Sequence, residues 1–176
     1  MINRLQTPSL AALLLLVTVA ASSTSLLPVA TSSAATIASC LPSQMRVIHG
    51  ASEGTAGTTY IPLIFSNAGR ACAIWGVPSV QPTLATRRHV GPAARNESIG
   101  EMPVRHVLLK GQSVSVAFGV VETGNYTPST CVARQAAGVV VALGTFVRPT
   151  YVHLSILVCT KRVSTTTRLI APGRAG

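Results

Sequence analysis

The sequence contains no aspartate among its 176 residues, and its acidic side chains are four glutamates: Glu53, Glu97, Glu101 and Glu122. Hydrolases that work with paired carboxylates would therefore have only glutamate to draw on. Glu97 and Glu101 are the two acids closest in the chain, and we interpret them as solvated loop carboxylates that pair with nearby arginines. The scarcity of acids also gives the chain a formal net charge of +10, which attracts it to anionic surfaces at low salt.

Aromatic residues are also scarce, at 4% of the chain. A nucleic-acid surface built on stacked rings would have few members here. Arg87 and Arg88 are adjacent, but most other basic residues are scattered along the sequence, whereas nucleic-acid binding clusters them on one face. We therefore expect no nucleic-acid partner. Trp75 follows a cysteine closely and is expected to pack in the core, the alternative being an exposed ring that stacks on a sugar.

Sequence motifs of catalysis and cofactor binding are missing. The chain has no Gly-x-Ser-x-Gly or Ser-x-x-Lys for an activated serine, and no Cys-x-x-Cys pair for zinc or redox chemistry. Candidate metal ligands occur without a His-x-His pattern: His49, His89, His106, His153 and Met102. We expect no catalytic residue, no cofactor and no metal. The alternative is a metal-handling protein or an enzyme whose site forms only when these side chains converge in the fold.

Residues 1–35 have the layout of an export signal peptide. Arg4 precedes an apolar run from Leu10 to Ala20, and small residues follow. Cleavage near residue 21 and cleavage near residue 35 both fit. The run is shorter than the roughly 20 apolar residues that span a bilayer, and the alternative is an uncleaved anchor that tethers the protein to the membrane. Residues 36–176 are expected to form one domain, because that length supports one hydrophobic core.

Apolar periodicity predicts β-strands through most of this domain. The segment Tyr60–Ser66, a turn at Asn67–Arg70 and the segment Ala71–Pro78 indicate two strands joined by a turn. Apolar residues alternate with small or polar ones from Val114 to Val120 and from Val152 to Val158. Further strands are expected at residues 45–47, 139–143 and 165–170, with loops at 53–59, 84–102 and 124–130. This pattern predicts an all-β fold, a sandwich of two antiparallel sheets, with a small barrel as the alternative.

Four cysteines follow the predicted export signal: Cys40, Cys72, Cys131 and Cys159. An even number of cysteines in an exported chain predicts two disulfides in an oxidising compartment. Four cysteines allow three connectivities, and the sequence by itself does not choose among them.

The chain resembles the secreted actinobacterial family called domain of unknown function 4232, over about residues 40–172. The residues that carry the resemblance are Cys40, the segment Leu63–Pro78 with Asn67, Cys72, Trp75, Gly76 and Pro78, the strand Val114–Val120, and the pair Cys131 and Cys159. Two features depart from the family pattern. Lys110 and Gly111 stand where the family usually has Pro-Gly, and the arginine-rich loop around Arg87 is peculiar to this chain.

The resemblance implies an exported, immunoglobulin-like β-sandwich in which neighbouring cysteines pair, Cys40 with Cys72 and Cys131 with Cys159. It implies no known activity. We therefore expect a monomeric, secreted or cell-envelope protein that is not an enzyme and that binds or lends structure in the envelope. A loop with Arg87, Arg88, His89 and Arg95 is the candidate contact surface for anionic cell-wall polymers or lipid headgroups.

Overall fold

The computed structural model describes residues 36–174. The predicted export signal, both of its cleavage positions and the alternative of an uncleaved anchor lie outside the described residues. Within the described part of the chain, no helix is long and apolar enough to cross a membrane.

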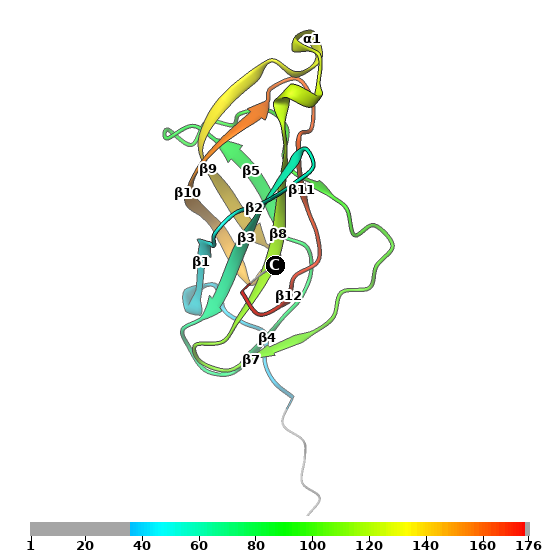
Figure 1. Cartoon of the computed structure of the whole chain (residues 1–176). Coiled ribbons are helices and arrows are strands. Elements are labelled where there is room, and N and C mark those ends of the chain that lie inside the picture. The colour runs from blue at the N-terminus through cyan, green and yellow to red at the C-terminus, as the bar shows by residue number, and fades with distance from the viewer. Residues whose placement is uncertain (1–35, 175–176) are drawn as a thin grey trace, which may run out of the picture. The chain divides into compact units, whose positions relative to one another are not determined.

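Two main sheets of mostly antiparallel strands and a separate two-stranded pair form the domain (Figure 1). The larger sheet has the strand order β1–β3–β8–β11–β6, with β2 added to β3 and β12 to β8. Its strands are β1 (Met45–His49), β2 (Glu53–Thr55), β3 (Thr58–Asn67), β6 (Arg95–Asn96), β8 (Ser113–Val121), β11 (Thr165–Thr167) and β12 (Ala171–Pro172). All of its strand pairs are antiparallel except β11 with β6.

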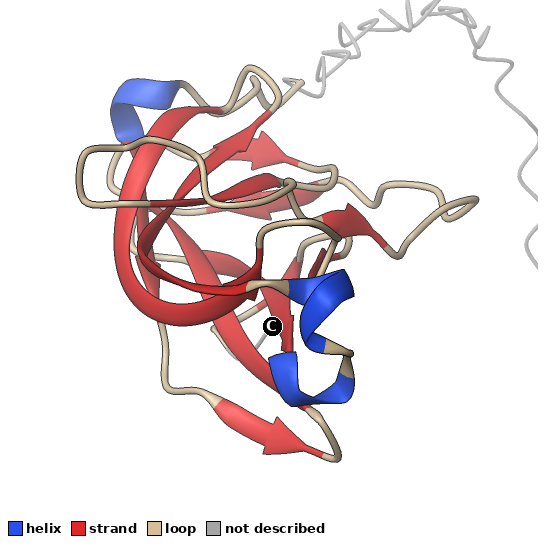
Figure 2. Ribbon diagram, turned by 90° about the horizontal axis from the view of Figure 1, so that it is seen from above, coloured by secondary structure: helices blue, strands red, loops and turns tan. Residues whose placement is uncertain are grey.

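The smaller sheet has the order β10–β9–β5. Its strands are β5 (Ser79–Thr83), β9 (Ala133–Leu143) and β10 (Val147–Cys159), and a separate antiparallel pair joins β4 (Cys72–Ile74) to β7 (His106–Leu108). Short helical turns occur at η1 (Pro42–Gln44), η2 (Thr123–Asn125) and α1 (Pro128–Cys131). Figure 2 shows these turns at the ends of the strands, outside the sheets. The predicted all-β antiparallel sandwich with two disulfides is confirmed.

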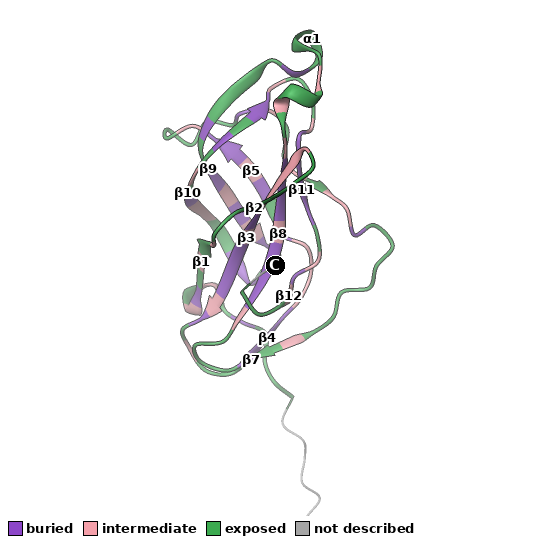
Figure 3. Ribbon diagram, viewed as in Figure 1, coloured by how far each residue is buried: buried purple, intermediate pink, exposed green. Residues whose placement is uncertain are grey.

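The hydrophobic core lies between the two sheets. Alternate residues of β3 face cross-strand partners on β8, as in the pairs Leu63–Val116 and Ile61–Phe118, and all four side chains are buried. Val139 and Val141 of β9 are buried as well, and Figure 3 shows buried positions along β3, β8, β9 and β5. Each such side chain contributes roughly 1.5–3 kcal/mol through its removal from water.

Three predicted loops contain regular structure. Residues 53–59 form a hairpin, because β2 pairs with the first residues of β3 and Gly57 takes a positive φ of 76° at the turn. Residues 124–130 contain parts of η2 and α1. Residues 84–102 include β6, and Val90 and Ser98 within that segment are buried. Polar and small residues in these segments hide the apolar alternation by which strands are recognised from sequence.

Two strands of the smaller sheet, β9 and β10, are longer than the sequence predicts, and the third, β5, is not predicted. The apolar run 139–143 is the C-terminal part of β9, which begins at residue 133, and the run 152–158 lies within β10, which spans residues 147–159. Small and polar residues dominate the extensions, so their pairing follows from the neighbouring strand and not from periodicity. The register of β10 against β9 shifts twice, between Val147 and Thr150 and between His153 and Ile156.

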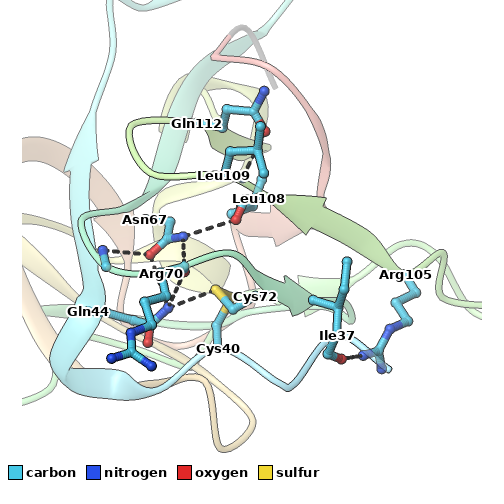
Figure 4. The surroundings of a disulfide bond; sticks show 11 residues. Ile37, Cys40, Gln44, Asn67, Arg70, Cys72, Arg105, Leu108, Leu109 and Gln112 are labelled. Atoms are coloured by element: carbon cyan, nitrogen blue, oxygen red, sulfur yellow. Dashed lines mark hydrogen bonds between the residues drawn. A yellow bond between two sulfur atoms is a disulfide. The ribbon is translucent and has the colours of Figure 1, made fainter. Parts of the chain in front are cut away.

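Disulfides join Cys40 to Cys72 and Cys131 to Cys159, which is the pairing that the family resemblance implies. The first disulfide lies beside the turn after β3 (Figure 4). The buried Asn67 forms hydrogen bonds there with both atoms of its side-chain amide, Nδ2 and Oδ1. Its Nδ2 donates to the carbonyls of Arg70 (2.7 Å) and Leu108 (3.0 Å). Its Oδ1 accepts from Nε2 of Gln44 (3.0 Å) and from the backbone of Gly69 (2.8 Å). Asn67 thereby ties η1, its own turn and the end of β7 together.

Candidate functional site

The hairpin that follows β5 presents three consecutive basic or titratable side chains to solvent. The chain turns between Leu84 and Arg88, where the backbone N–H of Leu84 donates to the carbonyl of Arg88 at 2.8 Å. Arg87 within this turn has a positive φ of 63°. The backbone N–H of Val90 then donates to Pro82 at 2.8 Å, and the side chain of Val90 is buried. Arg87, Arg88 and His89 are exposed at the turn. The buried Val90 therefore anchors a short hairpin that carries its charges outward.

Two aromatic side chains of β10 lie beside this hairpin. The guanidinium of Arg87 is over the ring of Tyr151, 5.5 Å from its centroid. The ring of Tyr151 meets the ring of His153 edge to face, with centroids 4.7 Å apart. The hydroxyl of Tyr151 donates to the carbonyl of Ala137 at 3.0 Å, which fixes the ring on the neighbouring strand. We name Arg87, Arg88, His89, Tyr151 and His153 the basic-aromatic face.

Acidic side chains are absent from the strands that carry this face. Residues 79–90, 133–143 and 147–159 contain four arginines, Arg87, Arg88, Arg134 and Arg148, and no glutamate. The four glutamates belong to β2 and to the segments that follow β6 and β8 in the larger sheet. The acids are thus confined to the larger sheet and its connections, and the smaller sheet with its hairpin carries only basic formal charges. Such a surface attracts anions without an internal carboxylate to compete for its arginines.

Arg95 does not belong to the hairpin with the other predicted contact residues. It lies in β6, which pairs with β11 in the larger sheet, and its guanidinium is 3.5 Å from the carboxylate of Glu97. Glu97 also accepts from Nε and Nη2 of Arg168 at 3.2 and 3.0 Å. The structure therefore separates Arg95, which is engaged in an ion pair, from the exposed bases of the hairpin.

The ion pairs of Glu97 show how the two glutamates that are closest in the chain, Glu97 and Glu101, are placed. Glu97 is a loop carboxylate with two arginine partners, as its sequence context predicts, whereas Glu101 is exposed and belongs to neither ion pair. It borders a cavity of about 600 Å³ together with Glu101, Met102, His106 and Arg168. Next to it, Ser98 accepts a hydrogen bond from the backbone of Leu169 at 3.1 Å. These contacts fasten the long segment after β6 to the C-terminal strand region.

The histidines and Met102 have separate environments. The ring of His106 is 3.1 Å from the carbonyl of Ile170, His49 is 3.0 Å from that of Gly50, and His153 packs on Tyr151. Met102 is 85% exposed. Among residues 36–174, no three His, Cys, Asp or Glu side chains are placed to hold one metal ion.

Trp75 is half-buried and packs against the core, as its sequence context predicts. Its ring meets Phe146 edge to face, with centroids 4.5 Å apart. The guanidinium of Arg105 covers it, 4.8 Å from the ring centroid. The guanidinium of Arg105 therefore occupies one face on which a sugar would otherwise stack.

Sequence reasoning missed Tyr151 and, with it, the aromatic half of the basic-aromatic face. A signal was present, since Tyr151 and His153 are two residues apart in an alternating strand and so share one side of the sheet. The opposing strand carries Gly138, whose lack of a side chain leaves room for the ring of Tyr151. Nothing in the sequence indicates that Arg87 reaches this ring.

Comparison with known proteins identifies the family of the chain and nothing further. No curated protein and no solved structure matches the chain significantly. One family model does match, over residues 40–170, and the resemblance that the sequence carries is thereby confirmed. The chain belongs to the family described as Domain of unknown function (DUF4232).

Proposed function

We propose that this chain is a non-catalytic, extracytoplasmic binding domain of the cell envelope, and that its basic-aromatic face holds phosphate-bearing wall polymers or lipid headgroups. The observation that carries the proposal is that no glutamate lies on the smaller sheet or its hairpin. Four arginines and no acid lie on the smaller sheet and its hairpin, whereas every glutamate belongs to the larger sheet or its connections. Two disulfides in so small a domain support an oxidising compartment.

The geometry of Arg87 supports a role in binding anions and not merely that of a charged side chain surrounded by water. A guanidinium presents a rigid fork of donors that matches phosphate oxygens. Because Arg87 already rests on the ring of Tyr151, it loses less conformational freedom on binding than an unrestrained arginine would. The neighbouring Arg88 and His89 add donors at the same turn. The face therefore combines one positioned guanidinium with further exposed donors beside it.

Retention on anionic surfaces tests the proposal. The protein is applied to vesicles that contain anionic phospholipid and, separately, to purified wall fragments, at low and high salt. Each basic residue near an anionic surface contributes about 1 kcal/mol, so the double variant Arg87→Ser/Arg88→Ser should bind about thirtyfold more weakly at low salt. Preference for vesicles or for wall fragments distinguishes a headgroup from a wall polymer.

The matched control is Arg46→Ser/Arg70→Ser, which removes the same charge from exposed positions of the larger sheet region. Its retention should stay close to that of the native protein. Equal losses of retention in both double variants would show that net charge alone determines binding. Retention that does not change with salt would remove the electrostatic explanation. Stronger retention on DNA than on either envelope surface would replace the proposed partner by a nucleic acid.

A further inference from the structure

A second cavity lies between the two sheets, away from the basic-aromatic face. It has a volume of about 460 Å³ and is lined by β3 and β8 of the larger sheet and by β10 of the smaller one. The end of β1 and the following residues 50–52 border it. Cavities of this size hold small molecules in other proteins.

The floor of this cavity is part of the hydrophobic core. Ile61, Val120 and Ile156 line it and are 4%, 7% and 7% exposed, and the half-buried Leu154 packs against the same core. An apolar group that enters the cavity would be removed from water on several sides. Burial of that kind contributes roughly 25 cal/mol per Å² of apolar surface.

The rim of the cavity is polar and carries one formal charge. Thr59 donates from its hydroxyl to the carboxylate of Glu122 at 3.4 Å, and Ser155 and His49 lie on the rim as well. Of the residues that line the cavity, Glu122 is the one acid, and none is a lysine or an arginine. The one formal charge on the lining is therefore negative, in a chain with a net charge of +10.

A β-bulge shapes the β10 side of the cavity. His153 pairs with Gly138 and Ile156 with Ala136, so Leu154 and Ser155 together oppose the single residue between those partners. The hydroxyl of Ser155 accepts from Nε2 of Gln135 at 2.8 Å, which holds the bulged backbone to β9. Bulges bend a strand and redirect side chains, and they are frequent beside binding sites.

We propose that this cavity binds a small molecule with an apolar body and an ammonium head. The body contacts Ile61, Val120 and Ile156, and the ammonium lies at the rim against Glu122, with the hydroxyls of Thr59 and Ser155 as further acceptors. A carboxylate or phosphate head is repelled by Glu122 and finds no cation on the lining to replace its water. The inference is independent of the proposed envelope binding, because it concerns another site and a ligand of the opposite charge.

Three probes of equal length and different head groups test the inference: 4-phenylbutylamine, 4-phenylbutanol and 4-phenylbutyrate. Each is titrated into the protein while backbone amide shifts are recorded by NMR. The amine should shift the amides of Thr59, Ile61, Val120 and Leu154, and it should bind more tightly than the alcohol and the butyrate. Because Glu122 is exposed, its charge should contribute about two- to fivefold to the affinity for the amine.

Two variants and one control complete the test. Glu122→Gln should bring the amine and the alcohol to the same affinity, and Ser155→Phe, at an exposed rim position, should abolish binding of both. Glu53→Gln removes the same charge from β2, outside this cavity, and should leave all three titrations unchanged. Any one of three results would overturn the inference. The first is that 4-phenylbutyrate binds as tightly as the amine, and the second is that Glu122→Gln does not change the affinity for the amine. The third is that the amine causes no shift at the cavity up to its solubility limit.

Discussion

The phenol ring of Tyr151 lies directly over Gly138 of the neighbouring strand. A Cβ atom at Gly138 would lie 2.5 Å from Cζ of that ring, which is too close for two non-bonded carbon atoms. The absence of a side chain at one position of β9 thus allows the position of the ring on β10, and this ring supports the guanidinium of Arg87. The placement of the basic-aromatic face therefore depends on a glycine that is not part of that face.

Gly138→Ala should displace the ring of Tyr151. Crowding in a packed contact costs about 1–3 kcal/mol of the free energy of unfolding, and chemical denaturation measures this loss. A double-mutant cycle isolates the contact. In a Tyr151→Ala background the same change should be neutral or stabilising, because alanine is favoured over glycine within a strand. An equal loss in both backgrounds would mean that the ring does not rest on Gly138.

Asn67→Ala should destabilise the domain strongly. The substitution removes four hydrogen bonds and leaves the carbonyl of Leu108, a buried residue, without this donor. Because unsatisfied buried groups cost about 1–3 kcal/mol each, we expect a loss of at least about 2 kcal/mol in the free energy of unfolding. Gln112→Ala is the control, since the exposed Gln112 accepts one hydrogen bond from Leu109. Similar losses for the two variants would contradict the structural role of Asn67.

The two disulfides should contribute nearly equally to stability. They close loops of similar length, with sequence separations of 32 and 28, and the chain-entropy description then assigns each about 3–4 kcal/mol. Replacement of either cysteine pair by alanines, followed by denaturation, measures each contribution. A loss below about 1 kcal/mol for either pair would contradict this expectation.

The first disulfide should also have a local effect. Residues 38–40 are held to β4 by hydrogen bonds from Cys40 to the carbonyl of Ala73 (2.9 Å) and from Ala73 to that of Ala38 (2.8 Å). Without the Cys40–Cys72 bond, the backbone amides of residues 40 and 73 should exchange their hydrogens faster than the amides in the centre of β3. Removal of the Cys131–Cys159 bond should not change the exchange rates of residues 40 and 73 relative to the centre of β3.

Arg105→Ala should change the fluorescence of Trp75, the single tryptophan of the chain. The guanidinium covers one side of the indole, so its removal should shift the emission to longer wavelength and raise quenching by acrylamide. Arg168→Ala is the control, because it removes the same charge at a residue whose partner is Glu97. An emission spectrum that neither variant changes would mean that Arg105 does not shield the ring.

Local sequence patterns were sufficient to predict the centre of the fold. The run Tyr60–Ser66 and the turn at Asn67 became β3 and its Asn-anchored turn, and the alternation from Val114 to Val120 became β8. These elements are predictable because one face of each strand is buried, which enforces period two. The family resemblance supplied the cysteine pairing, which the spacing alone left open.

The candidate sites were predictable only in part, because they depend on contacts between distant segments. Arg87 and Tyr151 are 64 positions apart, and their contact requires the hairpin after β5 to fold toward β10. The inter-sheet cavity depends on a register shift in β10, which no residue type marks in the sequence. Its closeness in sequence places Arg95 with the hairpin arginines, whereas in the structure β6 carries it into the other sheet.

Mapping the site of a soluble polyanion tests the central claim most directly. A short-chain polyphosphate is titrated into the native protein at low salt, and backbone amide shifts are followed by NMR. The account predicts that the largest shifts fall on residues 84–90 and 151–153, and that they vanish in Arg87→Ser/Arg88→Ser. Shifts spread evenly over all exposed arginines, or centred on Arg95 and Arg168, would contradict it.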